Sequence, residues 1–214
     1  MNRNRTQVET LNYIRNNIDC DFIINLGNSG IELNEPHFMW NSAEWVAPLL
    51  TPGATRKLMP IGYLPAQPEP DSWGWLKAPG RGGSGKTQRF LPYDFHLPRG
   101  WDTQKHIEGE EYRVITVGMK VVQVTSRAGT NENREYRWLG LSNTPSEVKS
   151  KARSAAANLQ GTNVIGWDLI QDKDENVYIL EGNACPGVND ATAQRVVDEI
   201  YRQREEEREV NNAY

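Results

Sequence analysis

The chain has 214 residues, of which 37% are hydrophobic and 24% are charged, and its formal net charge at pH 7 is -4. That length is enough for one domain, or for two closely packed lobes, around a hydrophobic core. The ordinary hydrophobic content excludes a disordered tail, and the acidic balance with dispersed Lys and Arg argues against nucleic-acid and anionic-membrane partners. No apolar run reaches the ~20 residues of a membrane helix and the start lacks the apolar core of a signal peptide, so we expect a cytoplasmic protein.

The N-terminal part is predicted to hold one helix and one strand before a linker. Residues 6–17 carry apolar side chains at helical spacing, and residues 20–27 are typical of a buried strand that ends in a glycine turn. Recurrent prolines over residues 60–72 predict an irregular linker. Cys20 and Cys185 are the only cysteines and lie far apart in sequence, as in a reduced intracellular protein.

A glycine-rich motif follows the linker. Residues 73–79 alternate like a strand, and residues 80–87 (GRGGSGKT) match the phosphate-loop pattern of P-loop nucleotidases. A P-loop requires a helix to begin at the Lys-Thr pair, so that the helix N-terminus faces the phosphates. Pro92 and Pro98 instead predict a loop or a short strand. We therefore expect a flexible turn that closes over a triphosphate as a lid, with a mobile surface loop as the alternative.

The middle of the chain predicts a hairpin followed by a helix. Residues 110–118 and 120–127 are typical of two antiparallel strands joined by a tight turn. Residues 144–147 (TPSE) predict a capping box with proline at the first helical position. The helix that they open is expected to run for about 15 residues and to end at Gly161.

Candidate metal ligands lie on the last two predicted strands. Asp168 is within the strand 164–170, and Glu181 and Asn183 alternate at the end of a second strand, after a polar turn. If the strands pair as a hairpin, these oxygen side chains converge, and two carboxylates with an amide suit Mg²⁺. The alternative is that the acids are surface residues, but their apolar neighbours make charge costly there without a cation. The last predicted element of the chain is a charge-rich helix over roughly residues 190–210.

Three segments resemble, in the same order, those of the ATP-grasp family. Residues 75–86 look like the lysine strand and glycine-rich flap of its small lobe. Residues 103–127 are similar to its adenine hinge and Glu-x-Arg strand, with a partner strand that ends in arginine. Residues 163–187 look like its metal-binding end. The resemblance, which covers residues 73–190, implies an α+β ATP-grasp fold with ATP between antiparallel sheets of two lobes.

The resemblance also implies domain boundaries and a set of nucleotide-binding residues. Residues 1–72 would be an abbreviated N-terminal segment with its linker, 73–107 the small lobe and 108–214 the large lobe. The nucleotide-binding residues would be Lys57, Lys77, Gly82, Gly83, Ser84, Gly85, Gln104, Lys105, Ile107 and Glu111.

Roles within this set follow from the same resemblance. Lys77 would contact the ATP phosphates, and Lys105 and Ile107 would meet the adenine through their backbones. Gln104 would lie at the adenine edge, and Glu111 would accept hydrogen bonds from the ribose. Lys57 is similar to a lysine that often precedes the small lobe, but it is equally an ordinary surface lysine in sequence terms.

The predicted catalytic residues are Arg113 and Arg127, which would face the phosphate and the acyl-phosphate; the alternative is a pair of surface arginines on a twisted hairpin. Asp168, Glu181 and Asn183 would hold Mg²⁺ on ATP, with two ions expected and Mn²⁺ as a substitute. Neither the imidazole of His106 nor the thiol of Cys185 is expected to take part. The seven tryptophans are dispersed and expected mainly in the core.

The implied activity is an ATP-dependent carboxylate-amine ligase that forms an amide through an acyl-phosphate and releases ADP and phosphate. The hairpin arginines look more like the RimK-like enzymes, whose acceptors are peptides or proteins, and Gly166 stands where D-alanyl-D-alanine ligases have arginine. Expected partners are ATP, a carboxylate and an amine acceptor, with another subunit or partner protein completing the acceptor site. The alternatives are a non-catalytic ATP-binding module and a P-loop nucleotidase or kinase.

Overall fold

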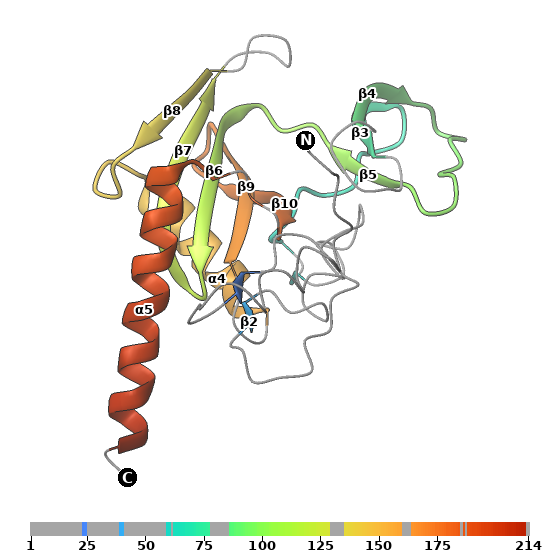
Figure 1. The fold of residues 1–214 in the computed structure, drawn as a ribbon. Helices are drawn as coiled ribbons and strands as arrows, with labels where there is room; N and C mark the ends of the chain where they lie inside the picture. The colour runs from blue at the N-terminus through green and yellow to red at the C-terminus, as the bar shows by residue number, and fades with distance from the viewer. Residues whose placement is uncertain are drawn as a thin grey trace, which may run out of the picture.

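In the part of the chain that it describes, a computed structural model has two antiparallel sheets, two helices and a short parallel strand pair (Figure 1). Strands β1 (Ile23–Ile24) and β2 (Met39–Trp40) form the parallel pair, and β1 lies within the strand predicted over residues 20–27. The helix expected at residues 6–17 and both cysteines lie outside the described residues. The described residues are 23–24, 39–40, 59–60, 62–77, 86–128, 135–159, 164–184, 186 and 188–212.

The smaller sheet has three strands in the order β4-β3-β5. They are β3 (Ser72–Lys77), β4 (Lys86–Leu91) and β5 (Asp102–Lys105), all antiparallel to their neighbours. Because β4 starts at Lys86, a strand occupies the place where a P-loop needs a helix. The P-loop alternative is therefore wrong.

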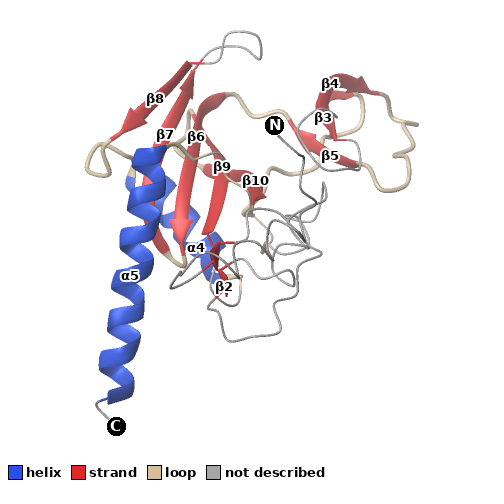
Figure 2. Ribbon diagram, viewed as in Figure 1, coloured by secondary structure: helices blue, strands red, loops and turns tan. Residues whose placement is uncertain are grey.

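The larger sheet has five antiparallel strands in the order β10-β9-β6-β7-β8 (Figure 2). The predicted hairpin is confirmed, since Gly118 sits in its turn at a φ of +53°, a conformation that glycine adopts without strain. In Figure 1, β10 lies at the edge nearer the small sheet and β8 at the far edge. The bounds are β6 (Gly109–Val117), β7 (Lys120–Ala128), β8 (Glu135–Leu139), β9 (Val164–Asp172) and β10 (Val177–Asn183).

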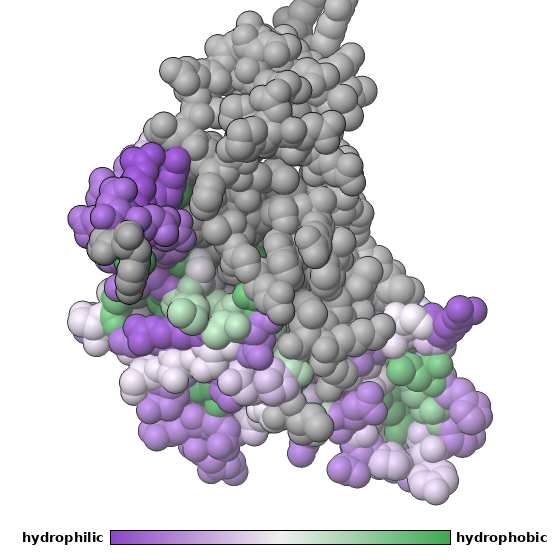
Figure 3. Space-filling view, turned by 90° about the horizontal axis from the view of Figure 1, so that it is seen from below, coloured by the Kyte–Doolittle hydropathy of each residue, from purple (hydrophilic) through white to green (hydrophobic). Residues whose placement is uncertain are grey.

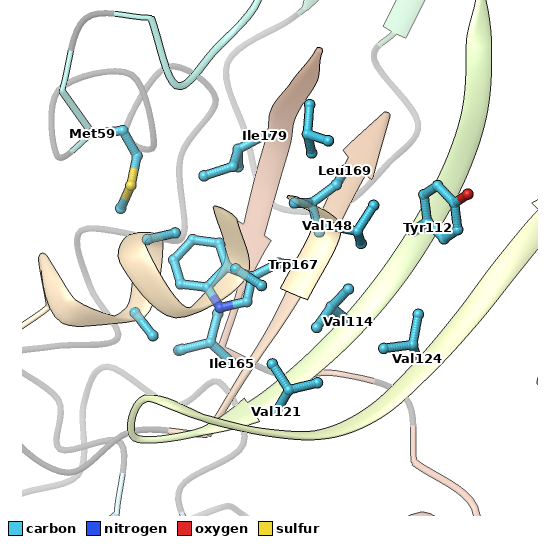
Figure 4. Close-up of a cluster of buried hydrophobic side chains, with 14 of the residues drawn as sticks. Met59, Tyr112, Val114, Val121, Val124, Val148, Ile165, Trp167, Leu169 and Ile179 are labelled. Carbon is cyan, nitrogen blue, oxygen red and sulfur yellow. The ribbon is translucent and has the colours of Figure 1, made fainter. Parts of the chain in front are cut away.

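Helix α4 (Ser146–Ala157) covers one face of this sheet, which we call the α4 face. Alternate residues of the strands point into the core between sheet and helix (Figure 4). Trp167 is fully buried there, and its Nε1 donates a 3.0 Å hydrogen bond to Thr116 Oγ1. Each large apolar side chain buried in this way contributes about 1.5–3 kcal/mol. The core includes Met59, Tyr112, Val114, Val121, Val124, Val148, Ile165, Trp167, Leu169 and Ile179.

The start of α4 differs from the prediction. The helix begins at Ser146, Pro145 takes the N-cap position, and no side chain caps the backbone. The Thr144 hydroxyl instead donates a 3.1 Å hydrogen bond to the Gly140 carbonyl, which closes the preceding turn, so it is not available as a cap. The capping box is therefore wrong, and the helix has 12 residues with its C-cap at Asn158.

Helix α5 (Asp190–Asn212) packs on the opposite face of the sheet, which we call the α5 face. Asn189 caps it, since its Oδ1 accepts a 2.9 Å hydrogen bond from the Thr192 N–H. Val196 and Ile200 pack against the sheet, whereas the C-terminal part of the helix runs past it and is hydrophilic on its surface (Figure 3). Neither helix that the structure describes has the length and apolar character of a membrane span.

Candidate functional site

A β-bulge in β10 determines which residues face the candidate site. Ile179 stands opposite Leu169 and points into the core, and regular alternation would send Glu181 to the same α4 face. The register shifts between Ile179 and Glu181, so that Glu181 stands opposite Asp168. Asn183 then stands opposite Gly166. The bulge therefore brings Glu181 and Asn183 to the side of the sheet that carries Asp168.

Arg113 completes this cross-strand row. It is opposite Asp168 in the pairing of β6 with β9, and both its Nε and its Nη2 donate to the carboxylate, the latter at 2.9 Å. Side chains directly opposite each other in an antiparallel pair share a face, so Arg113, Asp168 and Glu181 form one row across three strands. The two-pronged ion pair fixes the orientation of the Asp168 carboxylate.

Asp168 is an almost fully buried acid, 4% exposed. Burial raises its pKa above the ordinary aspartate value, the neighbouring Arg113 and Arg127 partly oppose that rise, and the Glu181 carboxylate adds to it. Two carboxylates thus face each other across the strand pair, an arrangement that a bound cation would stabilise.

The next row contains Glu111 and Arg127, which stand opposite each other on β6 and β7. Arg127 Nη1 lies 3.7 Å from Glu111 Oε2 and 3.5 Å from Asp168 Oδ2. Burial acts to lower the pKa of Arg127, but the neighbouring Asp168, Tyr136 and Glu111 outweigh it. The pKa is therefore raised above the ordinary arginine value, and the guanidinium stays charged. Its Nε is buried and, among the described residues, has no hydrogen-bond partner. Arg127 is therefore a charged group with an unused donor.

The small sheet supplies the opposite wall. Lys77 is 8% exposed, and its Nζ donates a 3.2 Å hydrogen bond to the carbonyl of Leu180, at the bulge. Trp75 lies two residues before Lys77 and donates from Nε1 to His106 Nδ1 at 3.0 Å. Lysine and bulge are 103 residues apart in sequence, so this contact joins the two sheets directly.

Gln104 is a buried side chain at the same wall, 2% exposed and opposite Trp75 in the pairing of β3 with β5. Its Nε2 has no hydrogen-bond partner within the described part of the chain, which costs folding free energy unless a ligand accepts from it. The N–H of Lys105 donates to the Ala66 carbonyl at 2.8 Å. A backbone contact from Lys105 to a base must therefore use its carbonyl.

These walls enclose a cavity of about 420 Å³ between the two sheets. That volume is within the range of small-molecule sites. Ten of the predicted site residues line it: Lys77, Gln104, Lys105, Ile107, Glu111, Arg113, Arg127, Asp168, Glu181 and Asn183. The other five, Lys57, Gly82, Gly83, Ser84 and Gly85, lie outside the described residues.

Four lining residues were not predicted: Trp75, His106, Ile170 and Leu180. Trp75 and Ile170 each lie two residues from a predicted site residue, so strand alternation could have identified them. The His106 imidazole accepts the Trp75 hydrogen bond at the cavity wall, and the expectation that it takes no part in the chemistry stays a prediction.

The oxygen donors of Asp168, Glu181 and Asn183 have the chemistry of a site for a hard cation. Among the described residues, no three His, Cys, Asp or Glu side chains are placed to hold a metal ion together, so a third side-chain donor at this cavity would have to be the Asn183 amide. Two carboxylates and an amide are hard oxygen donors that suit Mg²⁺. Both Asp168 oxygens accept from Arg113, so a metal must share this carboxylate or displace the arginine.

No protein-family model matches the sequence, and no curated protein matches it in sequence. Solved structures do match the fold. The ATP-grasp ligase PsnB, complexed with minimal precursor, aligns with a TM-score of 0.52 at 20% identity, over 72% of this chain and 58% of that one. D-alanine–D-alanine ligase from Bacillus anthracis, complexed with ATP, aligns with a TM-score of 0.64 at 15% identity, over 94% and 86%.

A third match is N5-carboxyaminoimidazole synthase from Aspergillus clavatus, in complex with ADP and 5-aminoimidazole ribonucleotide, with a TM-score of 0.53 at 13% identity. It covers 77% of this chain and 53% of that one. The chain thus spans less than two thirds of the PsnB and A. clavatus chains. At these identities the matches establish the fold: the chain has the α+β ATP-grasp fold, as predicted.

Proposed function

We propose that the chain is an ATP-dependent ligase that joins a carboxylate to an amine. The observation that carries this proposal is the convergence, on one cavity between the two sheets, of a buried lysine from the small sheet and a row of arginine and acidic side chains from the large sheet. Cations on both sides of an enclosed space suit a polyphosphate and a second anion. Residues 73–107 would act as the small lobe and 108–214 as the large lobe.

In this proposal the base of ATP lies against Trp75, Ile170 and the orphan amide of Gln104. Lys77 gives up the Leu180 carbonyl and donates to the phosphates, and Ile107 offers its backbone to the base. Glu111 accepts from the ribose, as the resemblance implies. Lys57 and the segment Gly82–Gly85 remain proposed phosphate contacts.

The reaction proposed is transfer of the γ-phosphoryl group to the carboxylate, followed by attack of the amine on the acyl-phosphate carbon. The carboxylate oxygen forms the new P–O bond while the bond to the β-phosphate oxygen breaks, and ADP leaves. The amine then forms the C–N bond, phosphate leaves, and the amine proton passes to solvent or phosphate. Arg113 and Arg127 would bind the carboxylate and stabilise charge on the transferring group.

Asp168, Glu181 and Asn183 would hold Mg²⁺, which supplies neutralisation of phosphate charge. If Asp168 bound a metal, the Arg113 guanidinium would be free to bind an oxyanion. Without ligands, the ion pair holds both side chains in place at the cavity. The Glu-x-Arg strand with an arginine opposite it supports a RimK-like enzyme within this class. Gly166 beside Arg113 also argues against the D-alanyl-D-alanine subgroup.

The test is ADP and phosphate release by the purified chain with Mg-ATP, in the presence of amino-acid pools or glutamate-rich peptides. We expect release that depends on an acceptor and that Asp168→Asn abolishes. Asp174→Asn, on the exposed turn between β9 and β10, is the matched control. ATP binding without turnover in every pool would instead favour a non-catalytic ATP-binding module, and absence of ATP binding would contradict the site assignment.

A further inference from the structure

The row of opposed residues that contains Asp168 continues to the far edge of the sheet. Thr125 stands opposite Arg113, and Trp138 of β8 stands opposite Thr125. In the adjacent row, Tyr136 stands opposite Arg127. Because directly opposed residues share a face, Tyr136 and Trp138 lie on the same face as Arg113 and Asp168. We call the surface formed by Tyr136, Trp138, Arg127 and Arg195 the aromatic strip.

The two aromatic side chains of the strip are exposed. Tyr136 is 57% and Trp138 is 58% exposed, so Trp138 departs from the expectation that the tryptophans are core residues. Two large exposed aromatics on an edge strand add no core packing and favour aggregation, which makes a binding role the better explanation.

Each aromatic ring makes a cation-π contact with an arginine guanidinium. The Arg195 guanidinium carbon lies 4.8 Å from the centre of the Trp138 ring, and that of Arg127 lies 5.2 Å from the centre of the Tyr136 ring. Arg195 is held in place by a 3.2 Å hydrogen bond from Nη1 to Gln123 Oε1. Arg127 also donates to the Tyr136 hydroxyl at 3.4 Å. Two guanidinium groups therefore lie along the strip, that of Arg195 at its outer end and that of Arg127 at the cavity, where Glu111 and Asp168 also pair with it.

We propose that the aromatic strip binds the chain of an extended, acidic peptide whose carboxylate reaches the Arg113 and Asp168 end of the row. This inference rests on the proposed ligase function and names its carboxylate substrate as a peptide segment. The guanidiniums of Arg127 and Arg195 pair with acidic side chains, and the Trp138 ring receives an apolar side chain.

The geometry of the sheet gives the spacing. Trp138 on β8 and Asp168 on β9 are separated by three strand intervals, or roughly 14 Å at the usual strand spacing. An extended peptide advances by about 3.4 Å per residue, so this distance corresponds to about four residues. A free amino acid is too short to meet both ends.

The probe is a fluorescein-labelled decapeptide of serine and aspartate with one glutamate and one phenylalanine four residues apart. Fluorescence anisotropy with Mg-ADP present would measure its affinity for the unaltered chain, Trp138→Ala, Arg195→Gln and Trp73→Ala. Trp73 is the matched control, since it is 59% exposed but lies on the small sheet. A second peptide places the phenylalanine next to the glutamate, and a third replaces aspartate by asparagine.

We expect Trp138→Ala to weaken binding of the first peptide by about tenfold or more and Arg195→Gln by several-fold, with ADP affinity unchanged. Trp73→Ala should bind as the unaltered chain does, and the second and third peptides should bind more weakly than the first. Equal affinity in Trp138→Ala, or no peptide binding by the unaltered chain, would overturn the proposal.

Two further readouts separate the alternatives. Sedimentation that shows self-association lost in Trp138→Ala, without peptide binding, would assign the strip to a second copy of the chain and overturn the peptide proposal. Acceptor-dependent ADP release is measured separately on the same preparations. Its absence with every acceptor would overturn the proposed ligase function, whereas the anisotropy series decides the peptide site by itself.

Discussion

Glu181 stands directly opposite Asp168 because β10 contains one extra residue before it. In a regular strand, Leu180 would face Asp168, and Glu181 would point into the core against α4. The bulge therefore converts a core-facing position into a cavity-facing one, and it brings two carboxylates together where a single buried acid would otherwise be paired by arginine.

Removing the Glu181 charge should affect the metal and leave the fold intact. For Glu181→Gln we expect metal-dependent ATP turnover to fall by about 100-fold or more, because the second carboxylate of the donor set is lost. Half-buried Glu181 adds nothing to the core, so the thermal midpoint should stay within a few degrees. Glu205→Gln on the exposed end of α5 is the control. Undiminished turnover in Glu181→Gln would contradict the metal assignment.

Removing the Arg113 guanidinium should affect stability as well. Arg113→Ala leaves the Asp168 carboxylate buried without its two-pronged partner, and we expect a loss of about 3 kcal/mol in the free energy of unfolding. Urea titration measures this loss. In Asp168→Asn the same arginine substitution should cost clearly less, because no buried charge is abandoned. Equal costs in the two backgrounds would show that the ion pair does not govern stability.

Replacing Gln104 should weaken ATP binding without lowering the stability of the fold, in contrast to Arg113→Ala. The Gln104→Met substitution removes a buried amide with an unused donor and replaces it with an apolar side chain of similar length. We expect unchanged or higher stability together with about tenfold weaker ATP binding, measured by calorimetry. A fold destabilised by Gln104→Met with unchanged ATP affinity would assign the amide to the scaffold and not to the nucleotide.

The ionisation of Glu199 should make the free energy of unfolding depend on pH. Burial raises its pKa, but hydrogen bonds from Arg202 and Gln203 and the nearby charge of Lys120 outweigh this and hold the pKa below the ordinary glutamate value. A lowered pKa contributes stability that is present above the unfolded value and lost as pH falls through the folded one. Glu199→Gln should therefore cost about 1 kcal/mol at pH 7 and almost nothing once the pH is well below the ordinary value. A cost that persists in acid would exclude an ionic origin.

The sequence predicted the strands of the large sheet well because their side-chain alternation is strong. Tyr112 and Val114 face the core, while Glu111 and Arg113 face the cavity, and the glycine turn sets the hairpin register. Convergence of the acidic residues was also anticipated from hairpin pairing. The bulge in β10 was not predicted. Its extra residue, Leu180, is a common strand residue, so the sequence pattern does not mark it as an insertion.

Other features lay beyond pattern recognition for related reasons. The Thr144 hydroxyl had two acceptable uses, capping a helix or closing a turn, and only the position of Gly140 decides between them. The partners of Arg113 and Lys77 depend on pairings between strands far apart in the chain. The exposed position of Trp138 follows from strand order, which local sequence does not encode.

One resting partner of Lys77 is a main-chain carbonyl, that of Leu180. Every amino acid carries that oxygen, so substitutions at position 180 can reshape the cavity without erasing the acceptor. A phosphate that accepts a hydrogen bond from Lys77 would compete with the Leu180 carbonyl. Because that carbonyl contact joins the two sheets, such binding would exchange an inter-sheet hydrogen bond for one to the phosphate. The acceptor of this contact between the two sheets is therefore supplied by the backbone, whichever side chain stands at position 180.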